Sequence, residues 1–275
     1  MLLNNLTDQC SESREQGERN LEGSGAGYLK DLAFAHPCAK HALFTRLNNA
    51  GQNPISGKQA IGLLVNYDAH AGLLRRLLLK AAAFMPEAAV GFVLENVRNE
   101  YGNGDYSMCH QGQLHDVIAQ VRKLTKLEEL EQPSLRKGVK RYIRQVVDYY
   151  HPHGDHVELK SGMYGPAITA GAITATELMA LEEFKAMQVA FRKFGLDYHP
   201  WFDHVNVECD HGEESLALAE HFIEKYDAAA SVEYGFNKTL EANVHLYDGL
   251  LEAIEAGEEE NAAFLGNRVN GADEK

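Results

Sequence analysis

The sequence predicts an all-α fold, and three observations support this class. Apolar residues recur at helical spacing in nearly every segment between residues 26 and 256, whereas runs of β-branched residues are short. Alanine and leucine, both strong helix formers, dominate these segments. The chain has only seven prolines, and each lies at a plausible boundary between two helices. We therefore expect seven to eight helices.

The boundaries of the helices are predicted from residues that commonly start or end a helix. Residues 26–50 form the first helical stretch, and Ser56 begins a second helix that continues to about Phe84. Pro86 suits the first turn of a third helix, because proline lacks the N–H that this position leaves unpaired. That helix should end at the YGNGD turn, residues 101–105. The remaining helices are expected at about 107–131, 134–150, 163–195, 200–230 and 233–256.

The domain organisation is expected to be simple. Residues 1–25 are polar and glycine-rich at their end, which predicts a flexible leader. Residues 26–256 form one helical domain without an internal repeat, and residues 257–275 form an acidic, disordered tail.

The charge of the chain excludes several classes of partner. Asp and Glu number 40 against 26 Lys and Arg, which gives a net charge of −14. Such a surface repels phosphate backbones, so nucleic acid is not an expected partner. No apolar run approaches the ~18–20 residues that span a bilayer, and the first residues lack the pattern of a signal peptide. We expect a cytoplasmic protein with no membrane association.

The four cysteines and 13 histidines point away from a disulfide scaffold and towards a metal site. The cysteines are scattered and form no CxxC pair, so neither a disulfide framework nor a thiolate zinc site is indicated. Histidine is unusually frequent beside many carboxylates. The question is whether some of these side chains converge on one metal.

The segment DHVNVECDHGEE holds the clearest candidate ligands, His204, Glu208 and His211. On an α-helix, offsets of four and seven residues fall at about +40° and −20° from the first residue. The three side chains therefore project from one stripe, and two imidazoles with a carboxylate suit iron or manganese. The alternative is a solvated polar helix whose histidines are accidental, since short motifs recur by chance.

Three further residues on other helices could complete such a site. Glu100 precedes the Gly-Asn-Gly turn and His110 follows it, so the end of one helix and the start of the next can converge. Glu177 lies in a small-residue apolar helix, with Ile173, Thr174 and Leu181 at helical spacings around it. A carboxylate there is costly to bury unless it is paired, protonated or bound to metal.

Together these segments resemble the haem-oxygenase-like diiron oxidases and oxygenases, relatives in fold of the TenA and PqqC proteins. The opening HPCAKHALFTRL and the HGEES after the last histidine add to the resemblance, which covers roughly residues 28–255. It implies a haem-oxygenase-like bundle with two Fe(II) ions and O2 as co-substrate. One departure is Glu208, where aspartate is the commoner residue of the family. The six ligands that the resemblance implies are Glu100, His110, Glu177, His204, Glu208 and His211.

The resemblance also implies the kind of reaction. Its members oxidise small molecules by N-oxygenation, desaturation or oxidative C–C cleavage, and we favour an amino acid or amine as substrate, in specialised metabolism. Domains of this fold are often dimers, which leaves a homodimer open. Some members carry an extra ligand on an earlier helix, for which Asp68 and His70 are the nearest candidates. Three tyrosines are further candidates for the pocket wall: Tyr67, Tyr101 and Tyr164.

Two other functions compete with this one. A metal-free helical binding protein of the same fold would need none of the six ligands. The string HPHGDH matches the signature of metallo-β-lactamase-type hydrolases, but that fold requires a preceding strand, and the residues before it are helical in pattern. The residues of this second motif are His151, His153, Asp155 and His156.

Overall fold

The fold is seen in a computed structural model, which describes residues 25–152 and 162–270, without the side chains of residues 204, 206–210 and 257–270. Within these ranges every regular element is a helix and no strand occurs, which confirms the all-α class. No helix in the described part of the chain combines the length and apolar character needed to cross a membrane.

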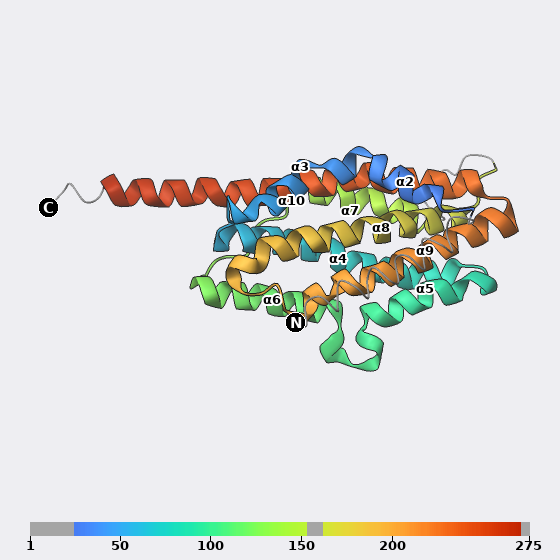
Figure 1. The fold of residues 1–275 in the computed structure, drawn as a ribbon, viewed down its shortest axis with the longest axis horizontal. Coiled ribbons are helices and arrows are strands. Elements are labelled where there is room, and N and C mark those ends of the chain that lie inside the picture. Colours follow the sequence, from blue (N-terminus) through green and yellow to red (C-terminus); the bar gives the residue numbers. More distant parts are fainter. Residues whose placement is uncertain (1–24, 153–161, 271–275) are drawn as a thin grey trace, which may run out of the picture.

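Nine α-helices make up the described part of the chain, joined by short 3₁₀ turns (Figure 1). They are α2 (Tyr28–Ala35), α3 (Ala42–Asn48), α4 (Gly57–Phe84), α5 (Glu87–Glu100), α6 (His110–Thr125), α7 (Lys137–Tyr150), α8 (Gly165–Phe191), α9 (His204–Tyr226) and α10 (Ala229–Asn270).

The count exceeds the expected seven to eight because the first helical stretch is divided. Helix α2 ends at Ala35, and His36 adopts an extended conformation with ψ 145°. The next residue, Pro37, restricts its predecessor to this region and opens a 3₁₀ turn instead of continuing the helix. Helix α3 then begins after His41.

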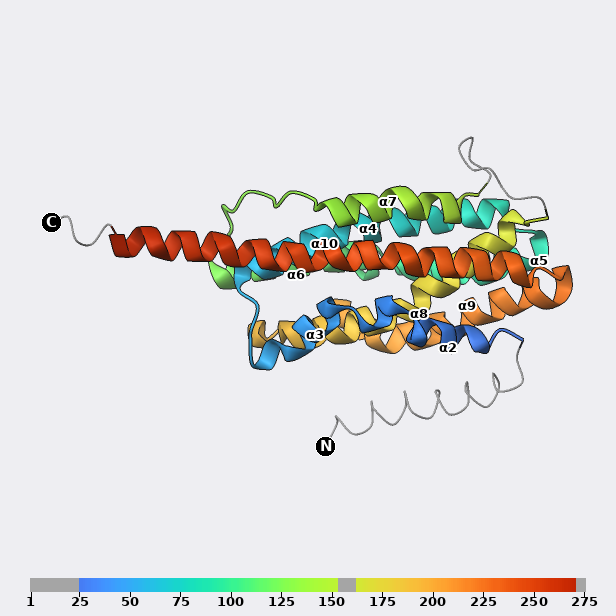
Figure 2. The same ribbon diagram turned by 90° about the horizontal axis from the view of Figure 1, so that it is seen from above.

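The last helix also differs from the sequence-based expectation. Helix α10 continues to Asn270, into the stretch expected to be a disordered tail. Glutamate and alanine, which recur in this stretch, have high helix propensity and allow the backbone to continue. In Figure 1 and Figure 2 this part of α10 projects beyond the other helices.

The long helices run roughly along the longest axis and pack into one bundle (Figure 1). Helix α10 packs against α8, α7 and α4, while α8 also packs against α9, and α4 against α5 and α6. Figure 2 shows α4 and α7 on one side of α10, and α8 and α9 on the other. The buried apolar residues form one continuous cluster across these helices.

Helix α8 lies at the centre of this packing. Most of its residues are buried, including the run from Gly165 to Ala175. A helix that is apolar on all sides is expected in a core, where a charged side chain is costly. Yet Glu177 and Glu183 of α8 are each only 7% exposed, and no other Asp, Glu, Lys or Arg among the described side chains is buried.

The helical setting does not support the metallo-hydrolase alternative. The HPHGDH string follows α7, which ends at Tyr150, where that fold requires a strand. His151 lies directly after the helix, whereas His153, Asp155 and His156 lie outside the described residues.

Two glycines allow α8 and α10 to approach each other closely. A Cβ atom added to Gly171 would lie 2.0 Å from the backbone oxygen of Val232, and one added to Gly235 would lie 1.9 Å from that of Ile168. Neither oxygen can move away without displacing its helix. The two backbones are therefore in contact at a place where only glycine fits.

We predict that Gly171→Ala destabilises the protein by about 1–3 kcal/mol, because α8 and α10 must move apart to make room for the added methyl group. The matched control is Gly91→Ala on α5, where an added Cβ meets nothing within 4 Å. That change should stabilise by about 0.5–1 kcal/mol, since alanine is the better helix former. Urea denaturation measures both, and equal stabilities for the two variants would contradict the close contact.

Candidate functional site

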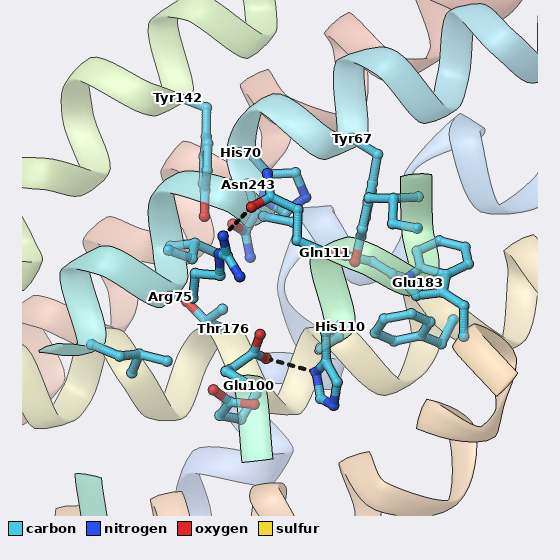
Figure 3. Close-up of a pocket in the computed structure, with 18 of the residues that line it drawn as sticks. Tyr67, His70, Arg75, Glu100, His110, Gln111, Tyr142, Thr176, Glu183 and Asn243 are labelled. Carbon is cyan, nitrogen blue, oxygen red and sulfur yellow. Dashed lines mark hydrogen bonds and ion pairs between the residues drawn. The ribbon is translucent and has the colours of Figure 1, made fainter. Parts of the chain in front are cut away.

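A cavity with a volume of about 80 Å³ lies among α4, α5, α6, α7, α8 and α10. Its wall is partly apolar, with Leu74, Leu78 and Leu114, and partly built from ionisable and hydrogen-bonding side chains. Figure 3 shows that the polar side chains come from different helices and face a common space. Glu100, His110 and Glu177, three of the six predicted ligands, are among the lining residues.

The break between α5 and α6 brings the first two predicted ligands together. Glu100 is the last residue of α5 and His110 is the first of α6. The intervening turn uses positive φ angles at Gly102, Asn103 and Gly104, which reverse the chain tightly. His110 Nδ1 then lies 3.2 Å from Glu100 Oε1. Figure 3 marks this ion pair with a dashed line. The convergence expected from the helix break is observed.

A second pair forms where α8 meets α9. His211 Nδ1 lies 3.7 Å from Glu177 Oε2, and the two side chains are 4% and 9% exposed. The other carboxylate oxygen, Oε1, accepts a hydrogen bond of 2.7 Å from the buried amide of Asn96 on α5. Glu177 is therefore held between α5 and α9, which fixes the orientation of its carboxylate.

The two pairs share a neighbour, Tyr150 on α7. Burial raises the pKa of Tyr150 above its usual value, and the negative charges of Glu177 and Glu100 raise this pKa further. Both carboxylates therefore lie close enough to act on one phenol. The Tyr150 hydroxyl donates to Thr176 Oγ1 at 2.9 Å, next to Glu177 on the same helix.

The remaining two predicted ligands are His204 and Glu208. Both belong to α9, which confirms the helix on which the three-residue stripe was predicted. Their side chains lie outside the described residues, so their role stays a prediction. Among the side chains that are described, no three His, Cys, Asp or Glu residues stand close enough together to hold a metal ion.

The predicted ligands that the structure brings together are chemically suited to iron. Two carboxylates and two imidazoles are the hard and borderline ligands that suit Fe(II). Three of them line the cavity, and the fourth, His211, contacts Glu177. The cavity also contains a buried histidine, His70, whose two ring nitrogens have no hydrogen-bond partner among the described residues. Buried polar atoms without partners are rare in folded proteins, and a bound water, ion or ligand would satisfy them.

Two of the five weaker candidates line the cavity. Tyr67 and His70 come from α4, with their ring centroids 4.4 Å apart in an edge-to-face contact. His70 is 4% exposed, and burial lowers its pKa to about 3. It is therefore a neutral imidazole at pH 7, able to accept a hydrogen bond or to bind a metal.

The other three weaker candidates do not line the cavity. Asp68 is hydrogen-bonded to two side chains of α6. Tyr101 is 36% exposed, with the guanidinium of Arg75 over its ring at 5.0 Å. Tyr164 stacks on Tyr226 at 5.4 Å, because its position at the start of α8 faces the end of α9. The structure therefore gives these residues other contacts.

Glu183 is a cavity residue that the sequence reasoning missed. Its carboxylate accepts a hydrogen bond of 2.7 Å from the Tyr247 hydroxyl and a further one from Tyr67. Burial raises its pKa to about 7, against the lowering effect of these hydrogen bonds. The signal was present, because Met179 and Met187 lie one helical turn before and after Glu183, as apolar residues do around Glu177.

Arg75 was also missed, and it is the one Arg or Lys among the described residues that line the cavity. Its guanidinium donates to Gln111 Oε1, a contact drawn in Figure 3, and to Cys109 Sγ at 3.2 Å. Its Nε is buried and has no hydrogen-bond partner within the described part of the chain. The cavity thus contains one fixed cation.

We predict that Glu183 makes the folded state less stable as pH rises. Its pKa is 4.5 in an exposed chain and about 7 when folded, so between these values the folded state holds a proton that the unfolded state has released. In EDTA, the wild type should lose up to about 3 kcal/mol more stability between pH 5 and 8 than Glu183→Gln. Urea titrations measure this, with Glu182→Gln as the control, because the neighbouring Glu182 side chain is only partly buried and pairs with Lys185. Parallel profiles for wild type and Glu183→Gln would contradict it.

No protein-family model matches the chain, and no curated protein matches it. The case for a function therefore depends on the contacts made by its own residues.

Proposed function

We propose that the protein is a non-haem diiron enzyme that uses dioxygen to oxidise a small substrate, with an amino acid or amine favoured. One observation carries the proposal. Glu100, His110, Glu177 and His211 are ligands that the family resemblance implies, and they form two carboxylate–histidine pairs that share the neighbour Tyr150. A solvated helix with accidental histidines would not be expected to bury His211 against Glu177.

Each pair would hold one side of the metal centre. Glu100 and His110 would bind one iron, while His211 would bind the other together with His204. Glu177 is suited to a bridging or closing position, because its two oxygens point to different neighbours. When bound, two ferrous ions supply electrons and open coordination positions for dioxygen.

Residues around the proposed metal ligands hold them in place. Asn96 donates to Glu177 and holds the carboxylate in one orientation, as partners of metal ligands commonly do. Leucine side chains of α4 and α6 form part of the apolar wall. The site is therefore partly ordered by contacts that involve no metal.

We predict that the protein binds two equivalents of Fe(II) in anaerobic titration. Glu177→Gln and His211→Ala should each reduce uptake to one equivalent or less, because each removes a donor from the buried pair. The control is His115→Ala, whose side chain is 57% exposed and whose partner is Asp68. Added oxygen should produce a transient visible absorption in the wild type that these two variants lack.

Two results would contradict the proposal. One is iron uptake no greater than in the two ligand variants. The other is a melting temperature that chelators leave unchanged together with a blank metal analysis, which is what a metal-free helical binding protein would give.

A further inference from the structure

The cavity has a second polar cluster, made of Glu183, Tyr67 and His70. Tyr67 connects the other two, because its hydroxyl is hydrogen-bonded to Glu183 while its ring contacts that of His70. All three side chains line the cavity. In Figure 3, Tyr67 and Glu183 lie on one side of the cavity and Arg75 lies on the opposite side. None of the three is one of the six predicted iron ligands, although His70 is a candidate for the extra ligand.

The carboxylate of Glu183 is buried without a positive partner. Its contacts are with the hydroxyls of Tyr67 and Tyr247, and no Lys, Arg or His among the described residues forms an ion pair with it. Burying a carboxylate this way is costly, and such residues occur often in functional sites. A cation entering from the cavity would remove that cost.

His70 adds an acceptor to the same cluster. Its ring is neutral at pH 7, because burial lowers its pKa to about 3, and neither nitrogen has a hydrogen-bond partner among the described residues. A neutral imidazole carries one acceptor nitrogen. The cluster therefore offers acceptors to a guest that carries several N–H donors.

The walls around the cluster are aromatic. Tyr67, Phe184 and Trp201 all line the cavity and contact one another edge to face, with centroid separations of 5.1 to 6.2 Å. Aromatic rings stabilise cations through their quadrupole and provide apolar surface for the attached carbon chain. An organic cation fits this surrounding better than a hydrated inorganic ion.

We infer that Glu183, Tyr67 and His70 form the subsite that binds the ammonium group of a small primary amine or amino acid. The N–H donors would reach the Glu183 carboxylate and the His70 acceptor nitrogen, and the carbon chain would lie against the aromatic rings. In an amino acid, the carboxylate would face Arg75 across the cavity. This inference rests on the proposed function for its role in the reaction, but the binding step itself needs no iron.

The test uses two ligands of the same shape, n-pentylamine and 1-pentanol, which differ in the ammonium group. Isothermal titration calorimetry of the full chain in EDTA measures both affinities at pH 8. We expect n-pentylamine to bind on the order of tenfold or more tightly than 1-pentanol. Glu183→Gln should remove this preference. Glu182→Gln should keep it, because Glu182 pairs with Lys185 and does not line the cavity.

A second measurement avoids any dependence on a variant that fails to fold. The wild-type affinity for n-pentylamine should rise between pH 6 and 8, because the Glu183 proton must leave when the ammonium binds. The groups that face Glu183 do not titrate in this range: burial raises the pKa of Cys38 to about 12, lowers that of His70 to about 3, and raises those of Tyr142 and Tyr247 well above 10. The affinity for 1-pentanol should not change.

Equal affinity for n-pentylamine and 1-pentanol, or an unchanged preference in Glu183→Gln, would overturn the inference. The inference would also be overturned if, in the absence of EDTA, a divalent cation binds and displaces n-pentylamine, and if Glu183→Gln abolishes binding of that cation. The subsite would then be a metal site. Failure of iron binding leaves these results intact. Conversely, two bound irons without amine selectivity would support the proposed function and reject the subsite.

Discussion

The buried carboxylates of α8 are the constraint on which the rest of the site depends. A helix that is surrounded by other helices cannot expose its charged side chains, so each carboxylate must find partners within the core. Glu177 has Asn96 from α5 and His211 from α9, and Glu183 has Tyr247 from α10. The neighbouring helices are therefore tied to α8 by polar contacts as well as by apolar packing.

The close packing of the bundle makes these contacts possible. Glycines at the contact of α8 with α10 bring the two backbones together, and the turn between α5 and α6 folds His110 back onto Glu100. The contact between the helices leaves no room for a side chain, and the turn needs positive φ angles, which residues other than glycine and asparagine rarely adopt. The wall of the cavity carries polar side chains that face a common space, as Figure 3 shows.

Much of the candidate site could be predicted because its signals are local. The turn after Glu100 and the apolar residues around Glu177 can each be recognised within a short segment of the sequence. Both Glu100 and Glu177 line the cavity. Glu183 has the same local signal as Glu177, apolar residues one helical turn before and after it, and could have been predicted. Arg75 was missed because its place in the cavity wall depends on how distant helices pack, which no short segment encodes. The division between α2 and α3 follows from Pro37 and could have been predicted, whereas the extension of α10 shows helix propensity prevailing over an acidic composition.

We propose that Glu100, His110, Glu177 and His211 bind iron directly. Crystals grown anaerobically with Fe(II), with diffraction recorded on both sides of the iron absorption edge, test it most directly. The account predicts anomalous peaks within coordination distance of both carboxylate–histidine pairs, with the cavity beside them. Iron peaks found only at surface carboxylates, with Glu177 and His211 still in mutual contact and no metal between them, would contradict it.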